Sequence, residues 1–135
     1  GRPVTFTPKS TRSFEAAVAT IASAHIKKPF LEGPLRVDIL AILARPKRLR
    51  RKKDPGGLIY APKRPDLDNL VKSIWDGMAS QWGDDAQVCA GEPVKVYAEI
   101  DGKPRVIVAI SQLEGCPQLN ERLMWAYSKD MDCSQ

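Results

Sequence analysis

Apolar residues recur at the helical period in two parts of the chain, which are therefore predicted to be helices. The first helix is expected from about Arg12 to Ile26, where Ser10 or Thr11 can cap the first amides and Pro29 follows the pattern. The second is expected from Leu67 to about Met78. Its wide apolar face is made by Leu67, Leu70, Val71, Ile74, Trp75 and Met78.

Three other segments alternate between apolar and polar residues, which indicates strands. They cover residues 35–44, Val94–Ile100 and Val106–Ile110. The second half of the first strand is apolar at consecutive positions, so it should be buried on both faces. Asp101-Gly102 lies between the other two segments and predicts a hairpin turn that pairs them.

This order of elements implies an α+β fold in which the two main helices pack on a small mixed sheet. A single domain is expected over residues 1–112, with a long segment inside it at 45–62. Connections of this length are often functional or disordered. Residues 113–135 should form a C-terminal extension with a short helix around Asn120–Tyr127 and a frayed end from Ser128.

Composition excludes several classes of protein and site. The chain lacks a run of 18 apolar residues, so we expect no membrane span. It also lacks an apolar stretch after Gly1-Arg2-Pro3, so we expect no signal peptide. The expected location is the cytoplasm. The start of the chain at glycine rather than methionine is expected of a processed or truncated chain. The chain has three cysteines and one histidine, His25, which is expected at the surface. This composition argues against a Cys/His zinc site and against a histidine-based catalytic triad.

Basic charge is concentrated in one run. The net charge is +5, and residues 45–53 hold seven basic side chains, so the rest of the chain is at about −2. A local basic strip suits a polyanion, and without interleaved aromatic residues it should contact phosphates rather than stack on bases. The alternative is a solvated loop. The candidate residues for contacts to nucleic-acid phosphates are Arg45, Lys47, Arg48, Arg50, Arg51, Lys52 and Lys53, with Lys63 and Arg64 further along.

Aspartates are concentrated around the second helix, at positions 66, 68, 76, 84 and 85. Residues two apart within a helix are rotated by about 200°, so Asp66 and Asp68 can converge only if Asp66 lies outside the helix. Each has a simpler interpretation. Asp66 or Asp68 can cap the helix, Asp68–Lys72–Asp76 can form an ion-pair ladder, and Asp84-Asp85 can be a turn.

A strand that restarts at Ala86 beside the helix start would carry Asp85 back toward Asp66 and Asp68. Three converging carboxylates repel one another unless a cation lies between them, and Mg²⁺ prefers such oxygen ligands. Bound metal ions can activate water and stabilise charge during phosphodiester hydrolysis. Lys72, one turn beyond Asp68, could stabilise charge on the phosphate or orient the water.

Two blocks of this segment have a specific combined pattern. The first is Arg64-Pro65-Asp66-Leu67-Asp68-Asn69-Leu70 followed by Lys72 and Asp76, and the second is Trp82-Gly83-Asp84-Asp85-Ala86-Gln87-Val88. Together they resemble the RusA family of Holliday-junction resolvases, found in bacteria, phages and prophages. Gly1-Arg2-Pro3 and Phe6-Thr7-Pro8-Lys9 resemble the family's N-terminal region, so the resemblance covers residues 1–111. A short strand that the family commonly has before Gly-Arg-Pro is not expected here.

The resemblance implies an endonuclease that depends on Mg²⁺ or Mn²⁺ and acts as a homodimer, making paired symmetric cuts across four-way DNA junctions. Carried over by position, Asp66, Asp68 and Asp85 would bind metal, and Lys72 matches the family's essential lysine. Asp84 matches a neighbouring acid and is a further candidate ligand. Asn69 and Gln87 fit the pattern with structural roles.

Two alternatives stay open at this point. The chain could be a non-catalytic junction-binding or DNA-binding protein, in which the basic strip matters and the aspartates serve as caps and ladder partners. It could also be a broader structure-specific nuclease that cuts flaps or forks, since the same site would serve both reactions.

Overall fold

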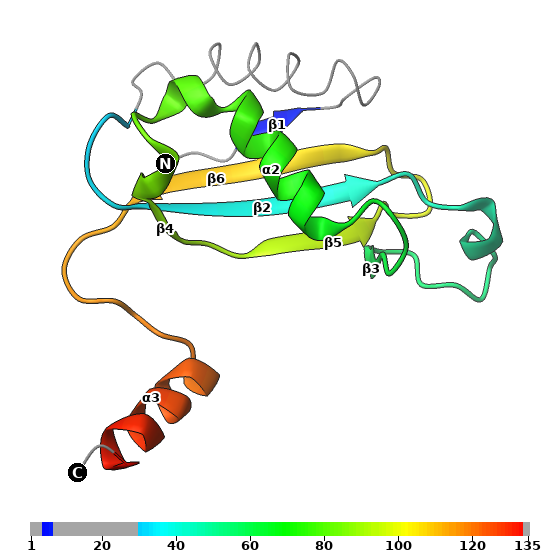
Figure 1. The fold of residues 1–135 in the computed structure, drawn as a ribbon. Helices are drawn as coiled ribbons and strands as arrows, with labels where there is room; N and C mark the ends of the chain where they lie inside the picture. Colours follow the sequence, from blue (N-terminus) through cyan, green and yellow to red (C-terminus); the bar gives the residue numbers. More distant parts are fainter. Residues whose placement is uncertain (1–3, 7–29, 134–135) are drawn as a thin grey trace.

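The computed structural model describes residues 4–6 and 30–133, and it has an α+β architecture, as predicted. Helix α2 (Leu67–Gly77) crosses one face of a six-stranded mixed sheet (Figure 1). The helix predicted at Arg12–Ile26, with His25 in its last turn, lies outside the described residues. The strands are β1 (Val4–Phe6), β2 (Leu35–Leu43), β3 (Ile59–Tyr60), β4 (Val88–Ala90), β5 (Pro93–Tyr97) and β6 (Arg105–Gln112).

Strand β2 lies in the middle of the sheet. The strand order is β1-β6-β2-β5-β3, and β4 pairs with the beginning of β2. Strand β2 is antiparallel to β6 and parallel to both β4 and β5. The sheet is therefore mixed, as expected, and its longest strand has a neighbour on both edges.

The predicted hairpin between β5 and β6 is wrong, although the turn itself is present. Gly102 N–H donates to the Glu99 carbonyl, which closes a turn over residues 99–102 with Ile100 and Asp101 at its centre. The two strands do not pair, because β2 lies between them and takes both sets of ladder hydrogen bonds. A nine-residue strand whose second half is apolar on both faces is more stable in the centre of a sheet than at an edge.

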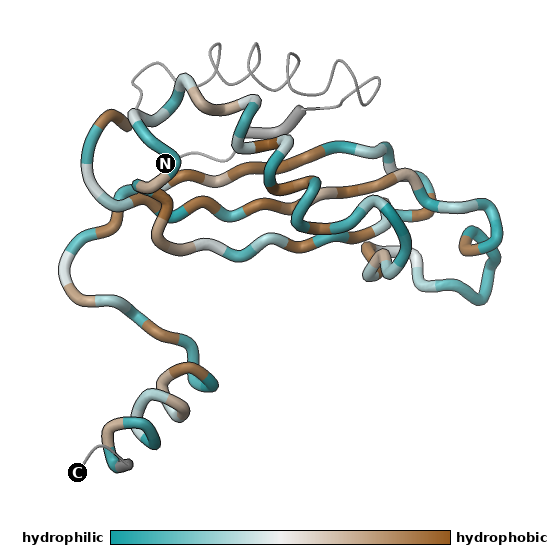
Figure 2. Tube along the Cα trace, in the orientation of Figure 1, coloured by the Kyte–Doolittle hydropathy of each residue, from teal (hydrophilic) through white to brown (hydrophobic). Residues whose placement is uncertain are grey.

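The main core lies between α2 and the sheet. Ile74 and Met78 of the helix segment are fully buried against Leu35 and Val108 of the strands. Figure 2 shows the matching apolar positions along β2 and β6. Burial of a side chain of this size contributes roughly 1.5–3 kcal/mol. This packing directs the opposite, charged face of α2 away from the sheet.

A second cluster confirms that the later part of β2 is buried on both faces. Ile42 points away from α2 and is buried with Val96 and Ala98 of the neighbouring segment. The parallel pairing of β2 with β4 and β5 is interrupted at Gly91, whose φ is +143°. A Cβ there would lie 1.8 Å from the Val37 carbonyl oxygen, so this irregularity requires glycine.

The basic segment 45–62 has its own local structure. It contains a 3₁₀ helix, η1 (Lys47–Leu49), and then β3, which pairs with β5 through Ile59 and Tyr97. Neither element was predicted. The segment extends beyond the end of the sheet where α2 begins (Figure 1).

Arg45 lies beneath this loop and is only 2% exposed. Its guanidinium donates through Nε to the Leu49 carbonyl (2.8 Å), through Nη2 to Pro55 (2.5 Å), and through Nη1 to Gly57 (3.1 Å) and Ala98 (3.4 Å). The assignment of Arg45 as a DNA contact is therefore wrong, because its side chain is buried and bonded to backbone carbonyls. Its role is to hold the loop together.

The C-terminal helix is longer than predicted. Helix α3 (Glu121–Cys133) continues through most of the segment expected to fray, and Asn120 caps it by accepting the Leu123 N–H at 2.9 Å. It projects away from the sheet (Figure 1), and its apolar side chains, including Leu123, Trp125 and Tyr127, are exposed. No helix in the described ranges is long and apolar enough to cross a bilayer.

The loop geometry predicts a stability effect at Arg45. Arg45→Met removes a buried guanidinium that donates to four backbone carbonyls, including that of the buried Ala98, so the free energy of unfolding should fall by about 2–4 kcal/mol. Arg48→Met is the matched control, because Arg48 is exposed, and it should change stability by less than about 0.5 kcal/mol. Urea denaturation measures both variants, and equal midpoints would contradict the structural role of Arg45.

Candidate active site

Asp66 occupies the N-cap position of α2, outside the helix as expected. Its backbone is extended, with φ −70° and ψ 144°, and its side chain makes no capping hydrogen bond. The capping interpretation therefore does not hold for Asp66. The segment before it is fixed by Lys95, a residue that sequence reasoning missed, whose Nζ donates to the carbonyls of Lys63 and Pro65, each at 2.7 Å.

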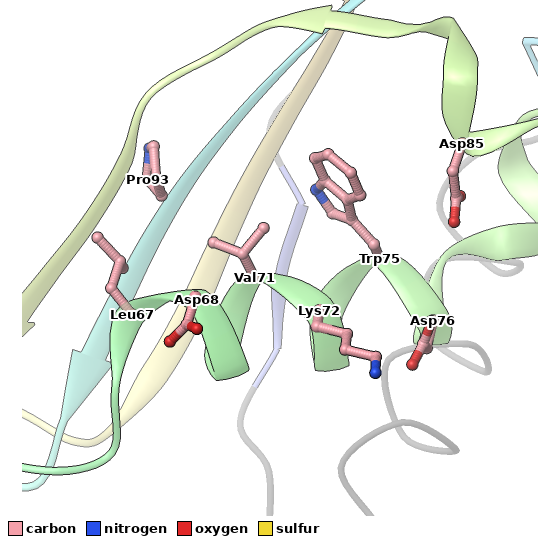
Figure 3. Close-up of a pocket in the computed structure, with 8 residues that line it drawn as sticks. All are labelled: Leu67, Asp68, Val71, Lys72, Trp75, Asp76, Asp85 and Pro93. Carbon is pink, nitrogen blue, oxygen red and sulfur yellow. The ribbon is translucent and has the colours of Figure 1, made fainter.

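A pocket of about 660 Å³ lies along the first three turns of α2 (Figure 3). Asp68, Lys72 and Asp76 are spaced four residues apart and follow one helix face at its rim. Apolar side chains form much of the remaining lining. The complete lining is Leu67, Asp68, Val71, Lys72, Trp75, Asp76, Asp85 and Pro93.

The ion-pair ladder proposed for this helix face is not formed. Ion pairs in the described part of the chain join Arg36 to Asp38, Arg51 to Asp54 and Arg105 to Glu99. None of these pairs includes Asp68, Lys72 or Asp76, and all three side chains are exposed. The lysine ammonium and the two carboxylates are therefore free to meet a ligand.

Asp84 caps the short 3₁₀ helix η3 (Asp85–Gln87), so the turn interpretation is correct for this residue. Its Oδ1 accepts the Ala86 N–H at 2.8 Å, while Gln87 Oε1 accepts the N–H groups of Gly83 (2.7 Å) and Asp84 (2.8 Å). Asp84 does not line the pocket. Its carboxylate shapes the turn that presents Asp85.

Gln87 also ties this turn to the segment that precedes β2. Its Nε2 donates to the carbonyls of Gly33 (3.1 Å) and Phe30 (3.4 Å). The approach is close at Gly83, where a Cβ would lie 2.7 Å from the Leu31 carbonyl oxygen. The predicted structural role of Gln87 is therefore confirmed.

Asp85 reaches the pocket from this turn. Its Oδ1 accepts a 2.7 Å hydrogen bond from the indole Nε1 of Trp82, which is 3% exposed. Figure 3 draws Asp85 beyond Trp75, toward the later part of α2, while Asp68 lies near the helix start. The structure thus brings Asp68, Lys72 and Asp85 to one pocket, and Asp66 does not line it.

The expected convergence of Asp66, Asp68 and Asp85 is not formed. No group of three or more acidic, histidine or cysteine side chains among the described residues could hold a metal ion. The chain returns to the helix start later than predicted, since it is Lys95 that bonds to Pro65. The donor chemistry still fits Mg²⁺, which binds through one or two carboxylates together with waters and substrate phosphates.

The basic side chains of segment 45–53, here called the basic loop, differ in their burial and in their partners. Arg45 is buried, whereas Arg50 and Arg51 have internal partners: Arg50 Nε donates to the Arg45 carbonyl and Arg51 pairs with Asp54. The Arg51 guanidinium holds the pKa of the Asp54 carboxyl below its usual value, mainly through their hydrogen bond. Four exposed side chains remain, here called the basic surface: Lys47, Arg48, Lys52 and Lys53.

Comparisons with known proteins identify the family of the chain. The family model Endodeoxyribonuclease RusA matches residues 1–111, a span that contains both acidic blocks and the basic loop and ends before α3. The "Uncharacterized protein YqaN" of Bacillus subtilis (strain 168) is 30% identical over 112 residues, covering 78% of this chain and 77% of that relative. The chain therefore belongs to the RusA family of endodeoxyribonucleases.

Proposed function

We propose that this protein is a metal-dependent endodeoxyribonuclease that resolves four-way DNA junctions by paired symmetric cleavage. The observation that supports it most is the pocket shared by Asp68, Lys72 and Asp85, in a chain of this family. Two carboxylates and one free ammonium beside an open pocket suit a phosphodiester, whose hydrolysis needs both a bound cation and charge stabilisation.

The proposal assigns metal binding to Asp68 and Asp85, which line the pocket. Asp66 is retained as a third carboxylate on the family pattern alone, because its side chain does not line the pocket. Asp84 is left out because its carboxylate accepts the Ala86 N–H. Mg²⁺, or Mn²⁺ in its place, would activate a water and stabilise charge on the phosphate. Because Mg²⁺ sites often need substrate phosphates as ligands, DNA binding would complete a site that the isolated chain leaves open.

Lys72 is proposed to bind the scissile phosphate. It lies one turn beyond Asp68 on the same helix face, and it has no ion-pair partner in the described part of the chain. An ammonium that is not already paired can stabilise developing negative charge without first breaking an internal contact.

The proposed substrate and assembly follow from symmetry and charge. A four-way junction is close to two-fold symmetric, so a C2 homodimer would present two identical sites to opposite strands. The basic surface would track a DNA arm through its phosphates and give affinity that falls with salt. A protein acting on DNA in this way would work in the cytoplasm of a bacterial cell.

The first prediction concerns Asp68. Asp68→Asn should lower the cleavage rate of a synthetic four-way junction in Mg²⁺ at least about 100-fold, because the ion then has one carboxylate ligand fewer. Junction affinity in EDTA should be equal or tighter, since a negative charge near the phosphate is removed. Cleavage is followed on denaturing gels, which also show whether the parent makes paired symmetric nicks.

The control for Asp68→Asn is Asp101→Asn, the same change at an exposed turn residue, which should leave cleavage unchanged. Equal cutting by Asp68→Asn and the parent would contradict the site assignment. Tight binding by the parent without cleavage under any metal condition would favour the non-catalytic alternative. Equal cleavage of flaps and forks would favour the broader nuclease.

The second prediction concerns the basic surface. Changing Lys47, Arg48, Lys52 and Lys53 to alanine should weaken junction binding and make the slope of log affinity against log salt shallower, by about 0.9 for each phosphate that these side chains neutralise in the parent. Stability should change little, because these side chains are exposed. A slope equal to that of the parent would show that this surface does not bind DNA.

A further inference from the structure

We infer that Trp82 is a positioning residue of the proposed site, which fixes the Asp85 carboxylate toward the pocket through its indole N–H. This inference rests on the proposed function, because it assumes that Asp85 binds the metal. It assigns a specific task to a tryptophan that would otherwise be interpreted as a core residue alone.

Asp85 belongs to a turn whose backbone is fixed but whose carboxylate is exposed. The cap formed by Asp84 and Gln87 holds the main chain on both sides of it. None of those bonds restrains the side-chain torsions of Asp85. The hydrogen bond from Trp82 Nε1 to Oδ1, at 2.7 Å, supplies that restraint and leaves the second carboxylate oxygen, Oδ2, for a ligand.

Trp82 is itself held rigidly. It is 3% exposed, shares the main core cluster with Ile74 and Met78, and pairs with Phe30 in an isolated β-bridge. A donor fixed in this way can fix its acceptor, because neither the indole ring nor its backbone can follow the movements of the carboxylate. Hydrogen bonds from a rigid support to a metal-binding side chain commonly change metal affinity or activity by about 10–100-fold.

A purely structural interpretation would have Asp85 present only to satisfy a buried indole. Trp75, which packs against the same core cluster, argues against that need, because its buried Nε1 has no hydrogen-bond partner among the described residues. Burial of an indole in this core therefore does not by itself bring a carboxylate to its N–H. The pairing at Trp82 is better explained by what it does for the carboxylate.

The test is Trp82→Phe, which keeps an aromatic ring in the core and removes only the donor and part of the ring volume. Mn²⁺ binding without DNA, measured by electron paramagnetic resonance, should weaken about 10-fold or more. The Mg²⁺ concentration for half-maximal cleavage should rise, while junction affinity in EDTA stays within about two-fold of the parent. Excess Mg²⁺ should restore part of the cleavage rate.

Two further variants separate positioning from stability. Trp75→Phe measures how much stability is lost when an indole without a hydrogen-bond acceptor is replaced by a smaller ring, and this loss is compared with that of Trp82→Phe. In an Asp85→Ala background, Trp82→Phe should cause no additional weakening of Mn²⁺ binding, because the residue acts through Asp85. Additive effects, or a weakening in Trp82→Phe that only follows its unfolded fraction, would overturn the inference.

A measurement on the unaltered chain keeps the test decisive if Trp82→Phe fails to fold. The three indole N–H signals in a ¹⁵N-correlated NMR spectrum can be assigned by single substitutions. Mn²⁺ should broaden the Trp82 signal at concentrations that spare Trp125, and Asp85→Ala should shift it. A Trp82 signal insensitive to both would overturn the inference.

The outcomes for the parent keep the two proposals apart. A parent that binds Mn²⁺ and cuts junctions, with Trp82→Phe indistinguishable from it, overturns the positioning role alone. A parent that neither binds Mn²⁺ nor cuts overturns the proposed function, and the positioning role with it.

Discussion

The central position of β2 determines where the neighbouring strands and α2 are placed. This strand is apolar on one face along its whole length and on both faces in its second half. It therefore needs a neighbour on each edge and cover on each side. Strand β6 takes one edge and β4 with β5 the other, while α2 covers the face that carries Leu35, Val37 and Ile39.

The candidate site follows from that packing. Because Ile74 and Met78 face the sheet, helical periodicity places Asp68, Lys72 and Asp76 together on the side turned away from it. The chain then leaves α2 through Trp82, which is anchored in the same core, and Asp85 comes three residues later. The same core thus fixes both sides of the pocket.

Neighbouring arginines in the basic loop have two different roles. Arg45 and Arg48 belong to the same run, yet the first is buried under four carbonyl groups and the second is exposed. A buried guanidinium satisfied in this way organises the backbone of the loop, from which the exposed cations project. A rigid basic surface loses less conformational entropy on binding a phosphate backbone than a flexible one.

Local periodicity and motif spacing were enough to predict the helix at residues 67–77 and the two long strands, and to identify the two acidic blocks and the family. The folded chain was needed to reveal that β2 separates β5 from β6, that Asp84 caps a turn while Asp85 faces the pocket, and that Arg45 is buried. Strand partners and the burial of one cation among several depend on contacts between residues far apart in the chain. The second acidic block contains both Trp82 and Asp85. Their positions in the motif do not reveal that the Trp82 indole donates a hydrogen bond to the Asp85 carboxylate.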